Sequence, residues 1–179
     1  FLDLKYHDIP NTVAGACAEA TKHGIAMVNV YAAGGREMMV QARAAVEAEV
    51  AKGAARPLLI AVTVLTSLNE ASLNEVGVSG AVGEQVVRLA KLAKEAGMDG
   101  VVASPKEIEL IRAACGPDFV IVTPGIRPSG SAKDDQQRVA TPLGAFKAGA
   151  DFLVIGRPIY DAPDPLAAAT GIARELTEG

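Results

Sequence analysis

The sequence predicts an α/β protein built around a parallel sheet, and three observations carry this prediction. Short apolar runs alternate with helical patterns along the chain, which is the order of elements in a parallel βα sheet. The apolar runs are continuous stretches of Val, Ile and Leu, as expected for strands that are buried on both faces. Several helical patterns end in a cation followed by glycine, as in Lys22-His23-Gly24 and Lys52-Gly53, which is typical of a helix C-terminus.

Each strand is predicted from a short apolar run bounded by helical or turn-forming residues. In chain order the strands are expected at Phe1–Lys5, Met27–Tyr31, Pro57–Val64, Gly100–Ser104, Phe119–Thr123 and Phe152–Ile155. The helices between and after them are expected at about Asn11–Lys22, Gly35–Ala51, Ala81–Ala96, Lys106–Ala114, Pro142–Lys147 and Pro165–Leu176.

Six strands fit either an open sheet or most of a (β/α)8 barrel, and periodicity does not choose between the two. A G-x-G-x-x-G fingerprint after a strand is missing from the sequence, which weakens the prediction of a dinucleotide-binding sheet. The chain opens with Phe1 rather than Met, already inside a predicted strand. We therefore expect residues 1–179 to form a single domain that is incomplete at its N-terminus.

Length, composition and charge restrict the partners and the cellular location. The 179 residues suffice for a domain with a real core. The net charge of −4 and the lack of a basic block argue against a nucleic-acid partner. No apolar run reaches the length of a membrane span, and no signal peptide is visible. Cys17 and Cys115 are the only cysteines; we expect both to be buried in a protein of the reducing cytoplasm.

The first residues bring charged side chains to one strand end. On a strand, residues two apart share a face, so Asp3 and Lys5 should point the same way, with Phe1 beside them and Leu2 and Leu4 opposite. Asp8 follows just past the strand. Such a cluster is costly to bury unless its members pair, and it can set up a charged reaction site. A structural salt bridge at the strand end is the alternative interpretation.

Two later strand ends indicate a phosphate site. The fifth predicted strand is followed by Thr123-Pro124-Gly125-Ile126-Arg127, and the sixth by Gly156-Arg157. Glycine lets backbone N–H groups approach an anion, and arginine adds a charge-assisted clamp. In (β/α)8 barrels the loops after strands 7 and 8 frequently bind phosphate, which these would be if two βα units precede Phe1. The alternative is that Arg127 and Arg157 form surface ion pairs.

The remaining polar residues give weaker signals. The stretch Ser129–Arg138 reads as a loop that could cover a site. Thr63 and Thr66 close the third strand, where a hydroxyl could bond a polar ring or cap a helix. His7 and His23 lie far apart in the sequence, so neither a metal cluster nor a Ser-His-Asp triad is expected.

At this point the motifs match a known family. The run from Asp3 to Thr12, Asp-Leu-Lys-Tyr-His-Asp-Ile-Pro-Asn-Thr, resembles the D-x-K-x-x-D-I-x-N-T signature of orotidine 5′-phosphate decarboxylase. Further segments match the bacterial branch of this family in order and spacing, and the resemblance covers the whole chain: Thr63–Ser67, Thr123–Pro128, Asp134–Gln136 and Ile155–Tyr160.

The resemblance implies a (β/α)8 TIM barrel, of which about six of eight βα units are present here. It implies a homodimer that needs no metal or organic cofactor and converts orotidine 5′-monophosphate to uridine 5′-monophosphate and CO2. By position, Lys5 would protonate C6 of the pyrimidine and Asp3 would lie against the departing carboxylate. Asp8 and Thr12 would reach the neighbour's substrate. The substrate would be bound by Thr66 at the pyrimidine edge, by Pro124 in the pocket wall, and at the phosphate by Arg127, Gln136, Gly156 and Arg157.

Two departures and two alternatives accompany the resemblance. The family also uses an Asp and a Lys from two earlier strands, which would precede Phe1, and Tyr31 stands where bacterial relatives often have His. One alternative is a magnesium-dependent sugar-phosphate decarboxylase or aldolase of the same barrel superfamily, which shares D-x-K-x-x-D. The other is a non-catalytic module that binds nucleotide phosphate.

Overall fold

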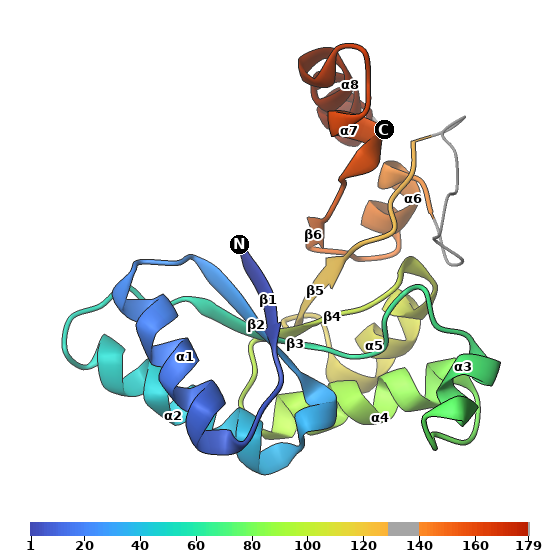
Figure 1. Cartoon of the computed structure of the whole chain (residues 1–179). Coiled ribbons are helices and arrows are strands. Elements are labelled where there is room, and N and C mark those ends of the chain that lie inside the picture. The colour runs from blue at the N-terminus through green and yellow to red at the C-terminus, as the bar shows by residue number, and fades with distance from the viewer. Residues whose placement is uncertain (129–139, 179) are drawn as a thin grey trace.

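The strands form one parallel sheet in the computed structural model, which describes residues 1–128 and 140–178. The spatial order of the strands equals their order in the chain. A doubly wound sheet would reverse direction at a switch point, whereas a sequential order is that of a barrel wall. Figure 1 shows the result, an open and curled half-barrel. The strands are β1 Leu2–Tyr6, β2 Met27–Tyr31, β3 Leu58–Val62, β4 Gly100–Val102, β5 Val120–Thr123 and β6 Phe152–Leu153.

Helices connect the strands where the sequence predicts them, with two short additions. The bounds of β2 and α6 agree with the prediction to the residue, whereas α3 and α7 were not predicted. The α-helices are α1 Pro10–Lys22, α2 Arg36–Val50, α3 Glu70–Glu75, α4 Val82–Glu95, α5 Ile108–Cys115, α6 Pro142–Lys147, α7 Arg157–Tyr160 and α8 Pro165–Glu178. Two 3-10 turns are η1 Ala32–Gly34 and η2 Pro105–Glu107.

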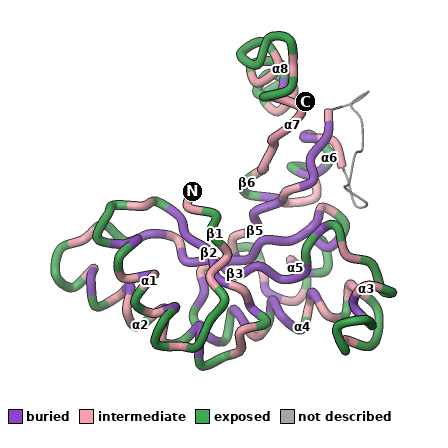
Figure 2. Tube along the Cα trace, viewed as in Figure 1, coloured by how far each residue is buried: buried purple, intermediate pink, exposed green. Residues whose placement is uncertain are grey.

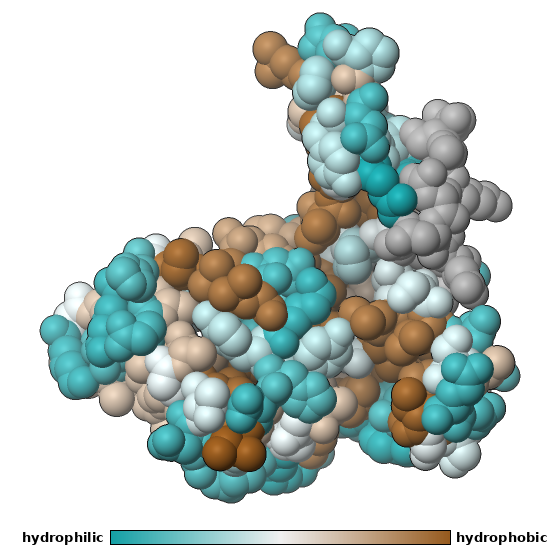
Figure 3. All heavy atoms as spheres, viewed as in Figure 1, coloured by the Kyte–Doolittle hydropathy of each residue, from teal (hydrophilic) through white to brown (hydrophobic). Residues whose placement is uncertain are grey.

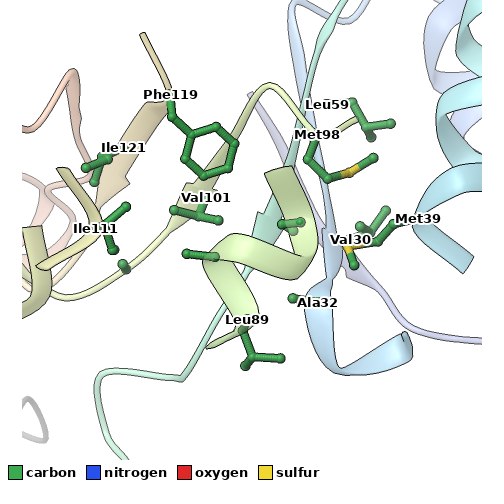
Figure 4. Packing of buried hydrophobic residues seen from close by; sticks show 14 of the residues in the cluster. Val30, Ala32, Met39, Leu59, Leu89, Met98, Val101, Ile111, Phe119 and Ile121 are labelled. Carbon is green, nitrogen blue, oxygen red and sulfur yellow. The ribbon is translucent and has the colours of Figure 1, made fainter. Parts of the chain in front are cut away.

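Side chains of the central strands alternate between two apolar layers. Val28 and Val30 of β2 face the helices, as does Leu59 of β3, and all three are fully buried. Figure 4 shows Val30 beside Met39 of α2 and Leu59 beside Met98. The opposite, inner face carries a second apolar cluster of Met27, Ile60, Val62, Val102 and Val122. Because right-handed crossovers in a sequential sheet put every helix on one side, this inner face is the barrel interior.

The C-terminal segment from β6 to α8 packs much less tightly than the rest. It projects from the body of the molecule, and few of its residues are buried (Figures 1 and 2). The 14-residue α8 buries only Ile172, whereas the 15-residue α2 buries five residues. Leu166 on α8 is 78% exposed. Figure 3 shows hydrophobic surface at the base of this segment.

Two arginine–aspartate clamps repeat at the end of the sheet where the strands begin. Arg43 of α2 donates to Asp99 Oδ2 at 2.5 Å, and the same oxygen accepts the Leu59 N–H at 2.7 Å. Arg112 of α5 donates to Asp151 Oδ2 at 2.6 Å, and that oxygen accepts the Ile121 N–H at 2.7 Å. Each aspartate thus joins its own strand to the preceding strand and to a helix.

Both cysteines are buried and unbridged, as the sequence predicts. Cys17 lies in α1, where desolvation raises the pKa of its thiol to about 11. A thiol with such a pKa stays protonated and behaves as a small apolar side chain. Among the described residues, no helix combines the length and the apolar character needed to cross a membrane.

Candidate active site

Asp3 and Lys5 form an ion pair on the inner face of β1. Lys5 Nζ donates to Asp3 Oδ1 at 2.7 Å, with the side chains 35% and 42% exposed. Phe1, Asp3 and Lys5 line the same pocket, which confirms the shared face that the spacing predicts. Leu2 packs against the helix-facing layer, but Leu4 is 58% exposed.

The backbone of β1 is irregular at these two residues, and the sequence did not predict this. Leu2 lies opposite Val28 and Tyr6 opposite Val30, so three residues of β1 face a single residue of β2. Lys5 has a φ of 53°, and it is the only non-glycine residue with a positive φ in the described part of the chain. A bulge of this kind bends a strand and re-aims its side chains, here toward the pocket.

Asn29 of β2 bridges the bulge. It was not identified from the sequence as a site residue. Its Nδ2 donates to Asp3 Oδ1 at 2.5 Å, and its Oδ1 accepts the backbone N–H of Lys5 at 2.7 Å. The side chain is fully buried. One signal was available, because Asn29 is a polar residue between Val28 and Val30 in an otherwise apolar strand.

The charged pair opens into a pocket of about 240 Å³ at the carboxyl ends of the strands. Thr66 and Pro124, both predicted to bind substrate, line this pocket together with Asp3 and Lys5. Its remaining walls are mostly apolar. They comprise Phe1, Val62, Val64, Leu65, Ser67, Val102, Ala103 and Val154. Thr63 does not line this pocket. Its hydroxyl donates to the Val102 carbonyl at 2.9 Å within the buried sheet.

Asp8 and Thr12 lie outside the pocket of their own chain. Both are exposed, and Asp8 Oδ1 accepts the backbone N–H of Ile9 at 2.6 Å, just before α1 begins. Tyr31 lies on the inner face of β2, packed against the inner apolar cluster. Burial raises the pKa of its phenol, and the charge of Asp3 adds to the rise. The centroids of the Tyr31 and His7 rings lie 5.4 Å apart.

Three of the residues predicted to hold phosphate, Arg127, Gly156 and Arg157, lie after β5 and β6 in the described part of the chain, and none of these three lines the 240 Å³ pocket. Arg127 is 92% buried rather than on the surface, with its Nη1 donating to the Ile126 carbonyl at 3.0 Å. Gly156 and Arg157 are partly exposed at the start of α7. Gln136 and the predicted cover loop Ser129–Arg138 lie outside the described residues.

The geometry provides a fixed ammonium–carboxylate pair in a largely apolar pocket. An ammonium held in such a place stabilises a negative charge that develops nearby and can donate a proton to it. The described residues contain no group of three or more His, Cys, Asp or Glu side chains that could hold a metal ion.

Comparisons with known proteins relate the whole chain to one family. It is 61% identical to the orotidine 5′-phosphate decarboxylase of Trichlorobacter lovleyi, over all of this chain and 74% of that protein. It is 60% identical to that of Moorella thermoacetica, over 98% of this chain and 71% of that protein. The crystal structure of the Lactobacillus acidophilus orotidine 5′-phosphate decarboxylase matches 98% of this chain and 74% of its own with a TM-score of 0.85 at 43% identity. The family described as orotidine 5′-phosphate decarboxylase / HUMPS matches residues 1–172, and the chain belongs to it.

Proposed function

We propose that this protein decarboxylates orotidine 5′-monophosphate to uridine 5′-monophosphate and CO2 in de novo pyrimidine biosynthesis. The observation that carries the proposal is the Asp3–Lys5 pair, joined at 2.7 Å on the wall of a pocket that also contains Thr66 and Pro124. Relatives at 55–61% identity carry the name of this activity. We further propose that the enzyme works in the cytoplasm without a metal or organic cofactor.

The proposed chemistry centres on Lys5. Loss of CO2 leaves an electron pair at C6 of the pyrimidine, where no neighbouring ring position delocalises it well. The Lys5 ammonium stabilises the developing negative charge and then donates a proton to C6, so that the C6–CO2 bond is replaced by a C6–H bond. Asp3 holds the ammonium in place through its Oδ1 and lies toward the departing carboxylate.

The proposed substrate orientation uses both ends of the site. Thr66 reads the pyrimidine edge and Pro124 packs against the ring. The phosphate is bound beyond β5 and β6, where the burial of Arg127 would fix a guanidinium for a bidentate contact. Binding energy from this remote group can hold the ring against Lys5. The residues proposed to bind the phosphate are Arg127, Gln136, Gly156 and Arg157.

The activity assay separates this function from the two alternatives. The purified full-length protein should release CO2 from orotidine 5′-monophosphate equally well with and without a metal chelator. A magnesium-dependent sugar-phosphate decarboxylase or aldolase would lose its activity with chelator and would act on sugar phosphates instead. A non-catalytic module would bind uridine 5′-monophosphate and release no CO2.

We also propose that the protein is a homodimer in which Asp8 and Thr12 serve the partner's site. The support is their exposure and their position outside their own pocket. Two-fold symmetry gives each chain the same patch on its partner, so inactive variants should complement one another. An Asp8→Asn protein mixed with a Lys5→Ala protein forms heterodimers with one intact site and one doubly defective site. Because random exchange makes half of the dimers mixed, about a quarter of all sites should recover activity. No recovery after verified subunit exchange would put Asp8 in the site of its own chain.

A further inference from the structure

We propose that Asn29 is a positioning residue that holds the Asp3–Lys5 pair in its reactive geometry. The inference rests on the proposed decarboxylation and adds a residue for which the motif comparison assigned no role. Three observations carry it: the bulge in β1, the left-handed backbone of Lys5 and the two hydrogen bonds of the Asn29 amide.

The bulge removes a strand partner from the backbone of β1, and a side chain takes its place. Three residues of β1 lie opposite one residue of β2, so the regular exchange of backbone hydrogen bonds is interrupted between Leu2 and Tyr6. Lys5 has a φ of 53°, in the left-handed region. This conformation is strained for a residue with a Cβ and persists only where the surrounding structure compensates for its cost. The Lys5 N–H finds its acceptor in Asn29 Oδ1 at 2.7 Å rather than in a strand carbonyl.

The second half of the same amide fixes the carboxylate. Asn29 Nδ2 donates to Asp3 Oδ1 at 2.5 Å, and that oxygen also accepts from Lys5 Nζ at 2.7 Å. Asn29 therefore binds the backbone of one member of the pair and the side chain of the other. Making both hydrogen bonds requires one acceptor and one donor in the same side-chain group. An amide has both, whereas a carboxylate has no donor and an alkyl group has neither.

The surroundings of Asn29 leave few other groups to take over this role. Asp3 and Lys5 face it from β1, and Tyr31 shares its face of β2. On β3 the residue in register is Ile60, which is apolar and fully buried. Loss of the amide would thus leave the Lys5 N–H without its acceptor and the Asp3 carboxylate with one donor fewer.

The experiment compares Asn29→Ala and Asn29→Asp in the full chain at pH 7. Both should lower kcat by about a hundredfold, as misplacement of a reacting group by about 1 Å does, and both should leave the affinity for uridine 5′-monophosphate unchanged. Asn29→Asp should be the more damaging variant because it puts a second carboxylate against Asp3. A role in packing alone predicts the opposite order, since Asp fills the volume of Asn and Ala does not.

A pH profile sharpens this comparison. Two adjacent carboxylates hold a shared proton at a higher pH than either would alone, and a protonated carboxyl again offers one donor and one acceptor. The kcat of Asn29→Asp relative to wild type should therefore rise as the pH falls from 7 to 5, whereas that of Asn29→Ala should not.

Thr21→Val is the matched control, because Thr21 is buried and its hydroxyl donates to the Cys17 carbonyl at 2.8 Å, within α1 and away from the pocket. It should lower the melting temperature and leave kcat unchanged. The positioning role is overturned if both Asn29 variants keep kcat within about threefold of wild type, or if their kcat falls only in proportion to the melting temperature. A wild-type protein that releases no CO2 would instead overturn the proposed function, and the positioning role with it.

Discussion

The body from β1 to β5 and the segment from β6 to α8 differ sharply in how firmly they are held. Strands β2 to β5 lie between two apolar layers, and α2 buries five residues against them. By contrast, β6 and α7 contain no buried residue and α8 contains one. The second clamp, from Arg112 to Asp151, joins the start of β6 to the body. Beyond that point β6 pairs with β5 at Phe152 and Leu153, and α8 packs on the short helices α6 and α7.

The proposed active site is divided between these two regions. Asp3, Lys5 and Asn29 belong to the body, where hydrogen bonds fix them before any substrate arrives. Charges that stabilise a transition state act best when they are preorganised in this way. Gly156 and Arg157 belong to the loosely packed segment, where binding of a phosphate can order the surroundings. Arg127, which is also proposed to bind the phosphate, is 92% buried in the body, so the proposed phosphate site draws on both regions whereas the proposed reacting pair belongs to the body alone.

Lys5→Ala tests the fixed half of the site and should have the largest effect. It removes both the counter-charge and the proton source, so kcat should fall at least about a thousandfold, while uridine 5′-monophosphate still binds through its phosphate. Steady-state kinetics and calorimetry measure the two quantities. The control is Lys22→Ala. Lys22 is paired with Glu19 at the same 2.7 Å distance on the exposed side of α1, so its removal should leave kcat unchanged. A Lys5→Ala protein that retains a tenth of the activity would show that the assigned role is wrong.

Ile111→Ala and Leu166→Ala test the difference in packing directly. Ile111 of α5 is fully buried (Figure 4), so its truncation should cost about 2–5 kcal/mol of the free energy of unfolding. Leu166 of α8 is 78% exposed, and its truncation should change that free energy by less than about 0.5 kcal/mol. Urea denaturation measures both. Equal losses would mean that α8 is packed as tightly in solution as α5 is, which would remove the contrast.

Arg157→Ala tests the part of the proposed site in the segment from β6 to α8. It should have the smallest effect on kcat. Loss of a hydrogen bond to a charged group costs about 1.5–3 kcal/mol, so phosphorylated ligands should bind about tenfold to a hundredfold more weakly. Free uridine should bind as before. Arg174→Ala is the control, because Arg174 is exposed on α8 and lies 3.9 Å from Glu178. An equal loss for nucleoside and nucleotide would make Arg157 a structural residue.

Most of the fold was predictable because short apolar runs and helix ends are local signals. The predicted ranges of β2 and α6 were reproduced, and the others differ at their ends by one or more residues. The short helices α3 and α7 were missed because neither has a periodic apolar face: α3 buries only Leu73, and α7 buries none of its residues.

The candidate site was predictable only in part. The spacing of Asp3 and Lys5 was enough to place them on one face, because a two-residue period follows from strand geometry alone. The bulge and the left-handed backbone at Lys5 were not predictable, since they depend on the register between β1 and β2, which distant residues set. Asn29 was missed for the same reason, because its partners lie 24 and 26 residues away in the chain.

The positive φ of Lys5 has a further consequence for how this protein can evolve. A left-handed backbone costs an ordinary residue about 1–2 kcal/mol, and glycine escapes this cost. Selection for thermal stability alone would therefore favour glycine at position 5, even though the change would discard the proposed proton donor. Under the proposed function, catalysis is what retains a lysine at this position, so a lineage that no longer needed the reaction would be free to exchange it for stability.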